Sequence, residues 1–88
     1  MHFYPEPWVQ ATTLDSGELI LIESRSGTMY QGNSTAGRMW QALVELNGDE
    51  TAVSREVAAM FGIDADRARR DLLTWLDELV DLGIVRAE

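Results

Sequence analysis

The chain has 88 residues, which is enough for one domain with a small core. It contains no cysteine, so disulfides and thiolate metal sites are excluded, and its formal net charge of −8 disfavours binding to a phosphate backbone. No stretch approaches the ~20 apolar residues of a membrane span, and the N-terminus lacks the basic and apolar regions of a secretory signal. We therefore expect one cytoplasmic domain, residues 1–88, that binds neither nucleic acid nor membrane and uses no cofactor.

Three short strands are predicted in the first third of the chain. Residues 1–7 contain two prolines and are expected to form an extended tail. The strands are expected at Trp8–Thr13, Glu18–Glu23 and Gly27–Gln31, because polar, Gly-containing turns separate these segments. Alternation along the third strand places Thr28 and Tyr30 on one face and Met29 and Gln31 on the other.

The second predicted strand is apolar on both faces. Leu19 and Leu21 point to one side, and Ile20 and Ile22 point to the other. A three-stranded sheet in so small a domain cannot be covered by helices on both sides. Either the N-terminal residues fold over the second face, or a partner protein docks there. We nominate Ile20 and Ile22 as the docking pair, or Leu19 and Leu21 if the sheet is reversed.

Three helices are predicted after the strands. They are expected at Ser34–Asn47, Thr51–Phe61 and Asp64–Leu82, with Thr51 and Asp64 as the N-caps of the second and third. Each helix carries an apolar stripe at the spacing of one buried face. The predicted fold class is α+β, a winged helix-turn-helix-like arrangement in which a three-stranded antiparallel sheet is followed by three helices.

Residues that carry covalent chemistry are nearly absent. The chain has seven Arg, no Lys, no Cys and one His near its N-terminus, which leaves no nucleophile beside a base. Asp77 and Asp81 lie one helical turn apart, but neither a phosphate-binding loop nor metal-ligand spacing accompanies them. We expect a protein that is not an enzyme and has no metal site.

The segment from Gly27 to Asn33 resembles the strand-to-helix segment of the PqqD-like family. Ala36 and Trp40 continue the similarity, and the residues Leu72, Leu76, Leu79 and Gly83–Val85 resemble the closing helix of that family. At Gly32 the family more often has an apolar residue. PqqD-like proteins are stand-alone recognition proteins for the leader peptides of ribosomally made precursors, and this chain is most similar to those of lasso-peptide pathways.

The resemblance implies a module that binds the precursor's leader and presents it to a leader peptidase and a cyclase on other chains. We expect the leader to add as a strand along the edge formed by Gly27, Thr28, Met29, Tyr30 and Gln31. We further expect a selective pocket of Met29, Gln31, Leu73 and Leu76. Arg69 and Arg70 are expected at its rim, where they would pair with leader carboxylates. The docking pair would bind the peptidase.

Two alternatives remain at this point. Arg67, Arg69 and Arg70 begin the third helix and would suit a DNA-recognition helix, although the rest of that helix is acidic. The simplest account of the cluster is intrahelical pairing, such as Asp66 with Arg70. The other alternative is a recognition protein for a different modifying enzyme, such as a radical enzyme.

Overall fold

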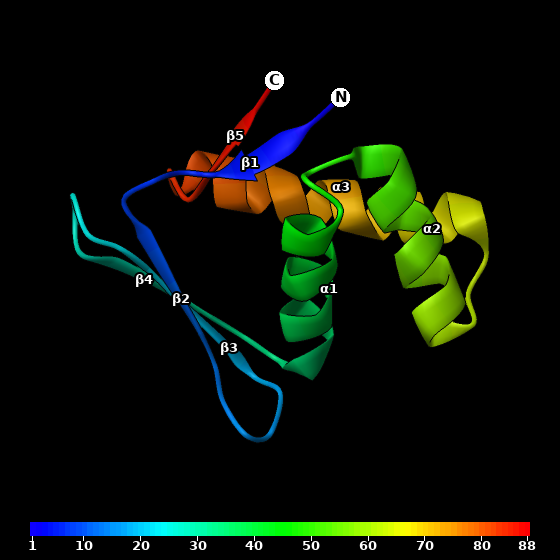
Figure 1. Ribbon diagram of the computed structural model, residues 1–88, viewed down its shortest axis with the longest axis horizontal. Coiled ribbons are helices and arrows are strands. Elements are labelled where there is room, and N and C mark those ends of the chain that lie inside the picture. Colours follow the sequence, from blue (N-terminus) through cyan, green and yellow to red (C-terminus); the bar gives the residue numbers. More distant parts are fainter.

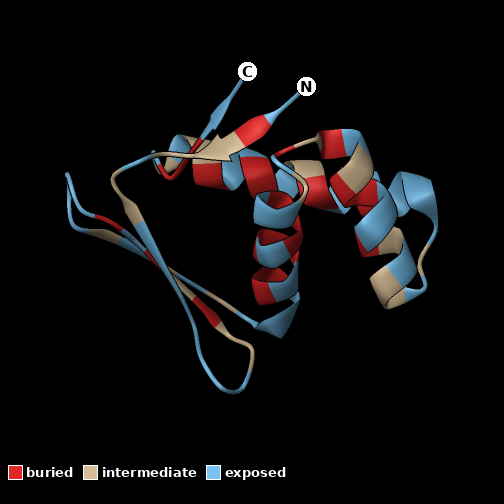
Figure 2. Ribbon diagram, viewed as in Figure 1, coloured by how far each residue is buried: buried red, intermediate tan, exposed pale blue.

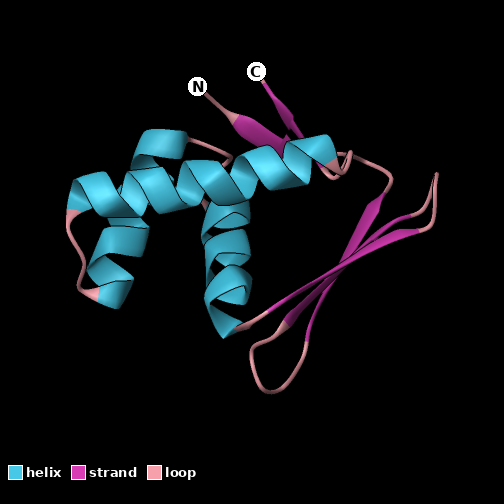
Figure 3. Cartoon of the chain, turned by 180° about the vertical axis from the view of Figure 1, so that it is seen from behind, coloured by secondary structure: helices cyan, strands magenta, loops and turns pink.

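The computed structural model describes all 88 residues as a three-stranded sheet beside three helices, with a small second sheet at the chain ends (Figure 1 and, from behind, Figure 3). The elements in order are β1 (Phe3–Pro5), β2 (Val9–Thr13), β3 (Leu19–Glu23), β4 (Thr28–Gly32), α1 (Ser34–Glu45), α2 (Glu50–Phe61), α3 (Ala65–Asp81) and β5 (Val85–Ala87). The α+β fold class is therefore confirmed, and the three predicted strands are each displaced by no more than one residue. None of the helices combines the length and the apolar character needed to cross a membrane.

The N-terminal residues are more than the expected extended tail, because they form a strand of a second sheet. Phe3–Pro5 form β1, which pairs antiparallel with β5 at the other end of the chain, so that Phe3 lies opposite Ala87. Phe3 is buried in the core, and its carbonyl lies so close to Gly48 that a Cβ there would be 2.2 Å from the oxygen. Figure 1 shows this terminal pair lying against α3. The two paired chain ends thus pack against the helices α1 and α3.

The three-stranded sheet has the order β2-β3-β4 and is antiparallel throughout. Its inner face carries Leu19 and Leu21, both fully buried, whereas Ile22 on the opposite face is 40% exposed. The N-terminal residues do not cover that outer face, because they pair with β5 instead. The expected division between the two leucines and the two isoleucines is therefore correct, and it is the isoleucines that face outward.

Side-chain caps set where each helix begins. Asn33 accepts a hydrogen bond from the backbone N–H of Ala36 at the start of α1, and Asp64 caps α3 as predicted. The N-cap of α2 is Asp49 rather than Thr51, because its carboxylate accepts from the backbone N–H of Thr51. A carboxylate two residues earlier can reach the free amides of the first turn, so α2 begins sooner than expected.

The core lies where the sheet, the helices and the terminal strands meet. Figure 2 shows buried positions along one side of α1 and α3 and at alternate residues of β3. Leu72, Leu76 and Leu79 of α3 are fully buried, and each such side chain contributes about 1.5–3 kcal/mol. Gly37 lets α1 approach the sheet, since a Cβ there would lie 2.2 Å from the carbonyl oxygen of Gly17. The side of α3 that faces β4 is thereby held against a fixed framework.

Candidate functional site

β4 is an edge strand, with β3 on one side and no strand on the other. Alternate backbone N–H and C=O groups along such an edge point away from the sheet and have no strand partner. The prediction that the third strand lies at a sheet edge is confirmed. β2 forms the opposite edge, so what distinguishes β4 is the set of side chains beside it.

The two faces of β4 differ sharply. Tyr30 lies directly opposite the buried Leu21, so its side chain belongs to the inner face. Met29 lies opposite Ile22 on the outer face and is 64% exposed, and Gln31 shares that face. The prediction that Met29 and Gln31 point toward the third helix was therefore wrong. Alternation had separated the two sets of side chains, but it could not tell which set faces the helices.

A hydrogen bond joins the middle of β4 to α3. The indole Nε1 of Trp75 donates to the hydroxyl oxygen of Tyr30 at 3.0 Å, across 45 residues of sequence. Trp75 is buried, and Tyr30 packs against the core. This contact identifies the flank of α3 that faces β4 as the flank that carries Trp75. Trp75 was not among the predicted site residues, because its place beside β4 depends on a contact between distant elements.

The opposite flank of α3 faces α2. Arg69 Nε lies 2.8 Å from Oε1 of the buried Glu50, the first residue of α2. At about 100° of rotation per residue, Leu73 lies about 40° from Arg69 and about 160° from Trp75. Leu76 is fully buried in the core. The structure therefore does not bring Leu73, Leu76 or Arg69 together with the outer face of β4 as a pocket.

Arg70 and the intrahelical pairing also differ from expectation. Arg70 is exposed and forms no ion pair, and the i, i+4 ion pair of α3 joins Arg67 to Asp71 at 3.6 Å. Asp66 instead donates its backbone N–H to the capping Asp64. The expected pairing of Asp66 with Arg70 is therefore absent, and the intrahelical pair of α3 is Arg67 with Asp71 instead.

Glu23 organises the turn that leads into β4. Its carboxylate accepts the backbone N–H of Arg25 at 2.6 Å and of Ser26 at 3.2 Å, and it also accepts the Ser26 hydroxyl. The Ser26 hydroxyl bond is the main reason why the pKa of Glu23 is lowered below 4.5, with the backbone N–H groups adding to it and burial opposing it. The start of β4 is thus fixed by a charged group on the inner side of the sheet.

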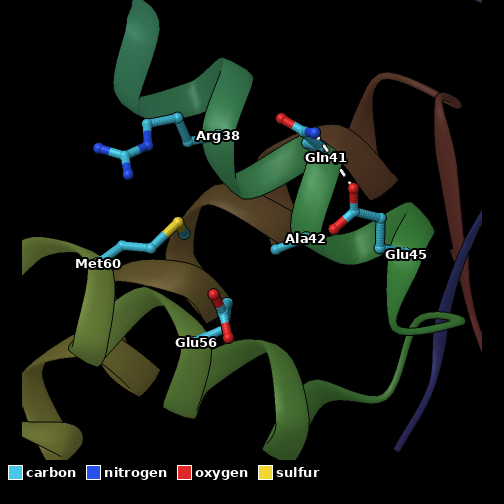
Figure 4. Close-up of a pocket in the computed structure, with 6 residues that line it drawn as sticks. All are labelled: Arg38, Gln41, Ala42, Glu45, Glu56 and Met60. Atoms are coloured by element: carbon cyan, nitrogen blue, oxygen red, sulfur yellow. Dashed lines mark hydrogen bonds between the residues drawn. The ribbon is translucent and has the colours of Figure 1, made fainter.

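None of the surface hollows of the molecule is lined by a residue of β4, although one includes Glu23 and Ser26 at the turn before it. Figure 4 shows one between α1 and α2, where Arg38, Gln41 and Glu45 face Glu56 and Met60, and where Gln41 donates to Glu45 at 3.1 Å. The others lie beside β2 and α1, beside Trp8, and between α2 and α3. No group of His, Asp and Glu side chains is placed to hold a metal ion. The strand edge beside Trp75 is therefore the candidate site.

Comparison with known proteins establishes the family. Residues 18–85 match the family model described as coenzyme PQQ synthesis protein D (PqqD). The chain belongs to the PqqD family. The PqqD match includes both β4 and α3, so the candidate site lies wholly within the shared region. No curated protein sequence matches the chain significantly.

Two solved structures share the fold over nearly the whole chain. One is described as TbiB1 in complex with the TbiA(beta) leader peptide, with a TM-score of 0.87, 20% identity, and coverage of 97% of this chain and 96% of that one. The other is described as lasso peptide synthetase B1 complexed with the leader peptide, with a TM-score of 0.83, 23% identity, and coverage of 99% and 100%. The similarity therefore includes the terminal strands as well as the PqqD region.

Proposed function

We propose that this PqqD-family chain is a non-catalytic recognition module of a lasso-peptide pathway in the cytoplasm. In this proposal it binds the leader of a ribosomally made precursor and presents the precursor to a separate leader peptidase and cyclase. The observation that carries the proposal is the free edge of β4 beside Trp75 of α3. Two proteins of the same fold, each described in complex with a leader peptide, support it.

The proposed binding mode is strand addition. An extended leader segment would hydrogen-bond to the free backbone groups between Gly27 and Gly32, which gives register but little sequence discrimination. Its inward side chains would fall beside Tyr30 and Trp75 rather than on the pocket expected from the sequence. Burial of one or two apolar anchors there, at about 1.5–3 kcal/mol each, would supply most of the affinity.

The outer face of the sheet is proposed as the docking surface for the leader peptidase. Ile22 is 40% exposed and Met29 is 64% exposed, and Ile20 lies beside them on the same face. This apolar surface adjoins the β4 edge, so a peptidase docked there would lie next to a leader held at that edge. Replacing Ile20 and Ile22 of β3 by Thr should weaken capture of the peptidase and leave leader affinity unchanged, since neither residue belongs to β4. Equal capture by the variant would overturn this assignment.

The name of the matching family points to one alternative function, which is recognition of a precursor for a different modifying enzyme. The matching model is named for coenzyme PQQ synthesis, so a module of this fold could serve a different modifying enzyme. The genes beside this one discriminate between the two. A small precursor with a peptidase and an asparagine-synthetase-like cyclase supports the lasso assignment, whereas a radical enzyme with its own precursor supports the alternative.

The proposal is tested by titrating the protein with the precursor encoded beside it. We expect one leader to bind per chain, with amide chemical-shift changes concentrated on β4 and α3. Mass spectrometry of the same mixture should show an unchanged precursor, since the chain has no Cys, no Lys and a single His near its N-terminus. Shift changes that avoid β4, or cleavage of the precursor by the purified protein, would contradict the proposal.

A further inference from the structure

Two carboxylates lie beside Trp75 on the flank of α3 that faces β4. Asp71 precedes Trp75 by four residues and Glu78 follows it by three, so each lies within about 60° of Trp75 around the helix axis. Both are exposed. The basic and aliphatic side chains of Arg69 and Leu73 lie about 120–160° away, on the flank toward α2.

Few cations are available to neutralise this flank. Arg67 pairs with Asp71 at 3.6 Å, but both side chains are at least 60% exposed, so solvent screens the pair. Glu78 forms no ion pair or side-chain hydrogen bond with the rest of the chain. Arg86 is committed to Glu6 and Glu88 near the termini.

An added strand would bring its side chains within reach of these carboxylates. Alternate residues of a strand share a face and lie about 7 Å apart. Along α3, Asp71 and Glu78 are displaced from Trp75 by about 4.5–6 Å. If one leader side chain packs beside the partly exposed Tyr30, at the level of Trp75, its neighbour on the same face therefore lies near a carboxylate, and a Lys or Arg has the length to reach it.

We propose that the leader segment bound at β4 carries a Lys or Arg next to its apolar anchor, and that Glu78, assisted by Asp71, selects that charge. This inference rests on the proposed function. The leader charge proposed here is opposite to the one expected from the sequence, which placed Arg69 and Arg70 at the rim to pair with leader carboxylates. In the structure Arg69 is paired with Glu50, and both arginines lie on the far side of the helix from Trp75. Glu78 has the larger role because Asp71 already has a partner.

The test uses a displayed library of random 12-residue peptides, selected separately on three proteins. These are the wild type, the Asp71→Asn/Glu78→Gln variant, and the control variant Asp77→Asn/Asp81→Asn, which loses the same two charges from the same helix. Asp77 and Asp81 lie about 160° and 120° from Trp75. Circular dichroism verifies that each variant folds, and the single Glu78→Gln variant serves if the double variant does not. Amide shifts report whether selected peptides bind at β4.

On the wild type and the control, we expect peptides with Lys or Arg two positions from an apolar residue. The Asp71→Asn/Glu78→Gln variant should still bind at β4 without that preference. Replacing the selected cation by Gln should weaken binding to the wild type about three- to fivefold, and less in high salt. Peptides that bind at β4 without a preference for Lys or Arg would overturn this inference but not the proposed function. The same holds if the preference persists in the Asp71→Asn/Glu78→Gln variant. If no selected peptide shifted the β4 amides, both this inference and the proposed function would be contradicted.

Discussion

Replacing Tyr30 by Phe removes the oxygen that accepts the indole N–H of Trp75 and leaves the ring in place. A hydrogen bond of this kind contributes about 0.5–1.5 kcal/mol net, and leaving a buried donor without a partner costs up to about 3 kcal/mol. Because Trp75 is only 7% exposed, we expect Tyr30→Phe to lower the free energy of unfolding by about 1–2 kcal/mol. For a domain of this size, a change of 1 kcal/mol corresponds to about 4–8 °C in Tm.

A double-mutant cycle isolates the bond from the packing of the rings. Tyr30→Phe, Trp75→Phe and the double variant are compared with wild type by urea unfolding, and we expect a coupling of about 1 kcal/mol between the two sites. Tyr4→Phe is the matched control, because the hydroxyl of Tyr4 makes no hydrogen bond in the structure. If the effects of the two single substitutions sum to the effect of the double variant within about 0.3–0.5 kcal/mol, the two side chains are not coupled and the bond does not hold β4 to α3.

Three further predictions concern the framework around the site. The pKa of Glu23 is lowered below 4.5, so its stabilising contribution is complete above that pH and is lost as the pH falls further. The gap in urea midpoint between wild type and Glu23→Gln should therefore shrink from pH 7 to pH 3, and a constant gap would contradict this. Arg69→Met should cost about 1–2 kcal/mol of unfolding free energy by leaving Glu50 unpaired, while peptide affinity stays unchanged in calorimetry. Phe3→Ala should cost about 3–5 kcal/mol in thermal unfolding, whereas a free tail would tolerate it.

The sequence predicted the fold well because most of its determinants are local. Apolar periodicity placed the strands and helices, and Asp64 and Gly-containing turns marked their ends. The terminal sheet escaped prediction because β1 and β5 pair across almost the whole chain, and no local pattern records such a pairing. Pro5 argued against a strand, but it lies at the end of β1 on a two-stranded edge, where a missing N–H costs little.

The candidate site was predicted only in part. The edge position of the third strand followed from the order of the elements, but the side chains beside it did not. Alternation separated Tyr30 from Met29 without showing which of the two faces the helices, and helical periodicity likewise left the two flanks of α3 equivalent. The register of Tyr30 against the buried Leu21 and the bond from Trp75 decide both questions. The register joins neighbouring strands, but the burial of Leu21 depends on tertiary packing, and the bond from Trp75 joins residues 45 apart in sequence.

Amide hydrogen exchange of the complex with the precursor leader tests strand addition most directly. If the leader pairs with β4, alternate amides between Thr28 and Gly32 should exchange at least about tenfold more slowly in the complex, because an added strand bonds every second backbone group. The free edge of β2, Val9–Thr13, serves as the internal control and should be unaffected. Slowing along β2, or a bound leader that leaves the β4 amides unprotected, would contradict the account.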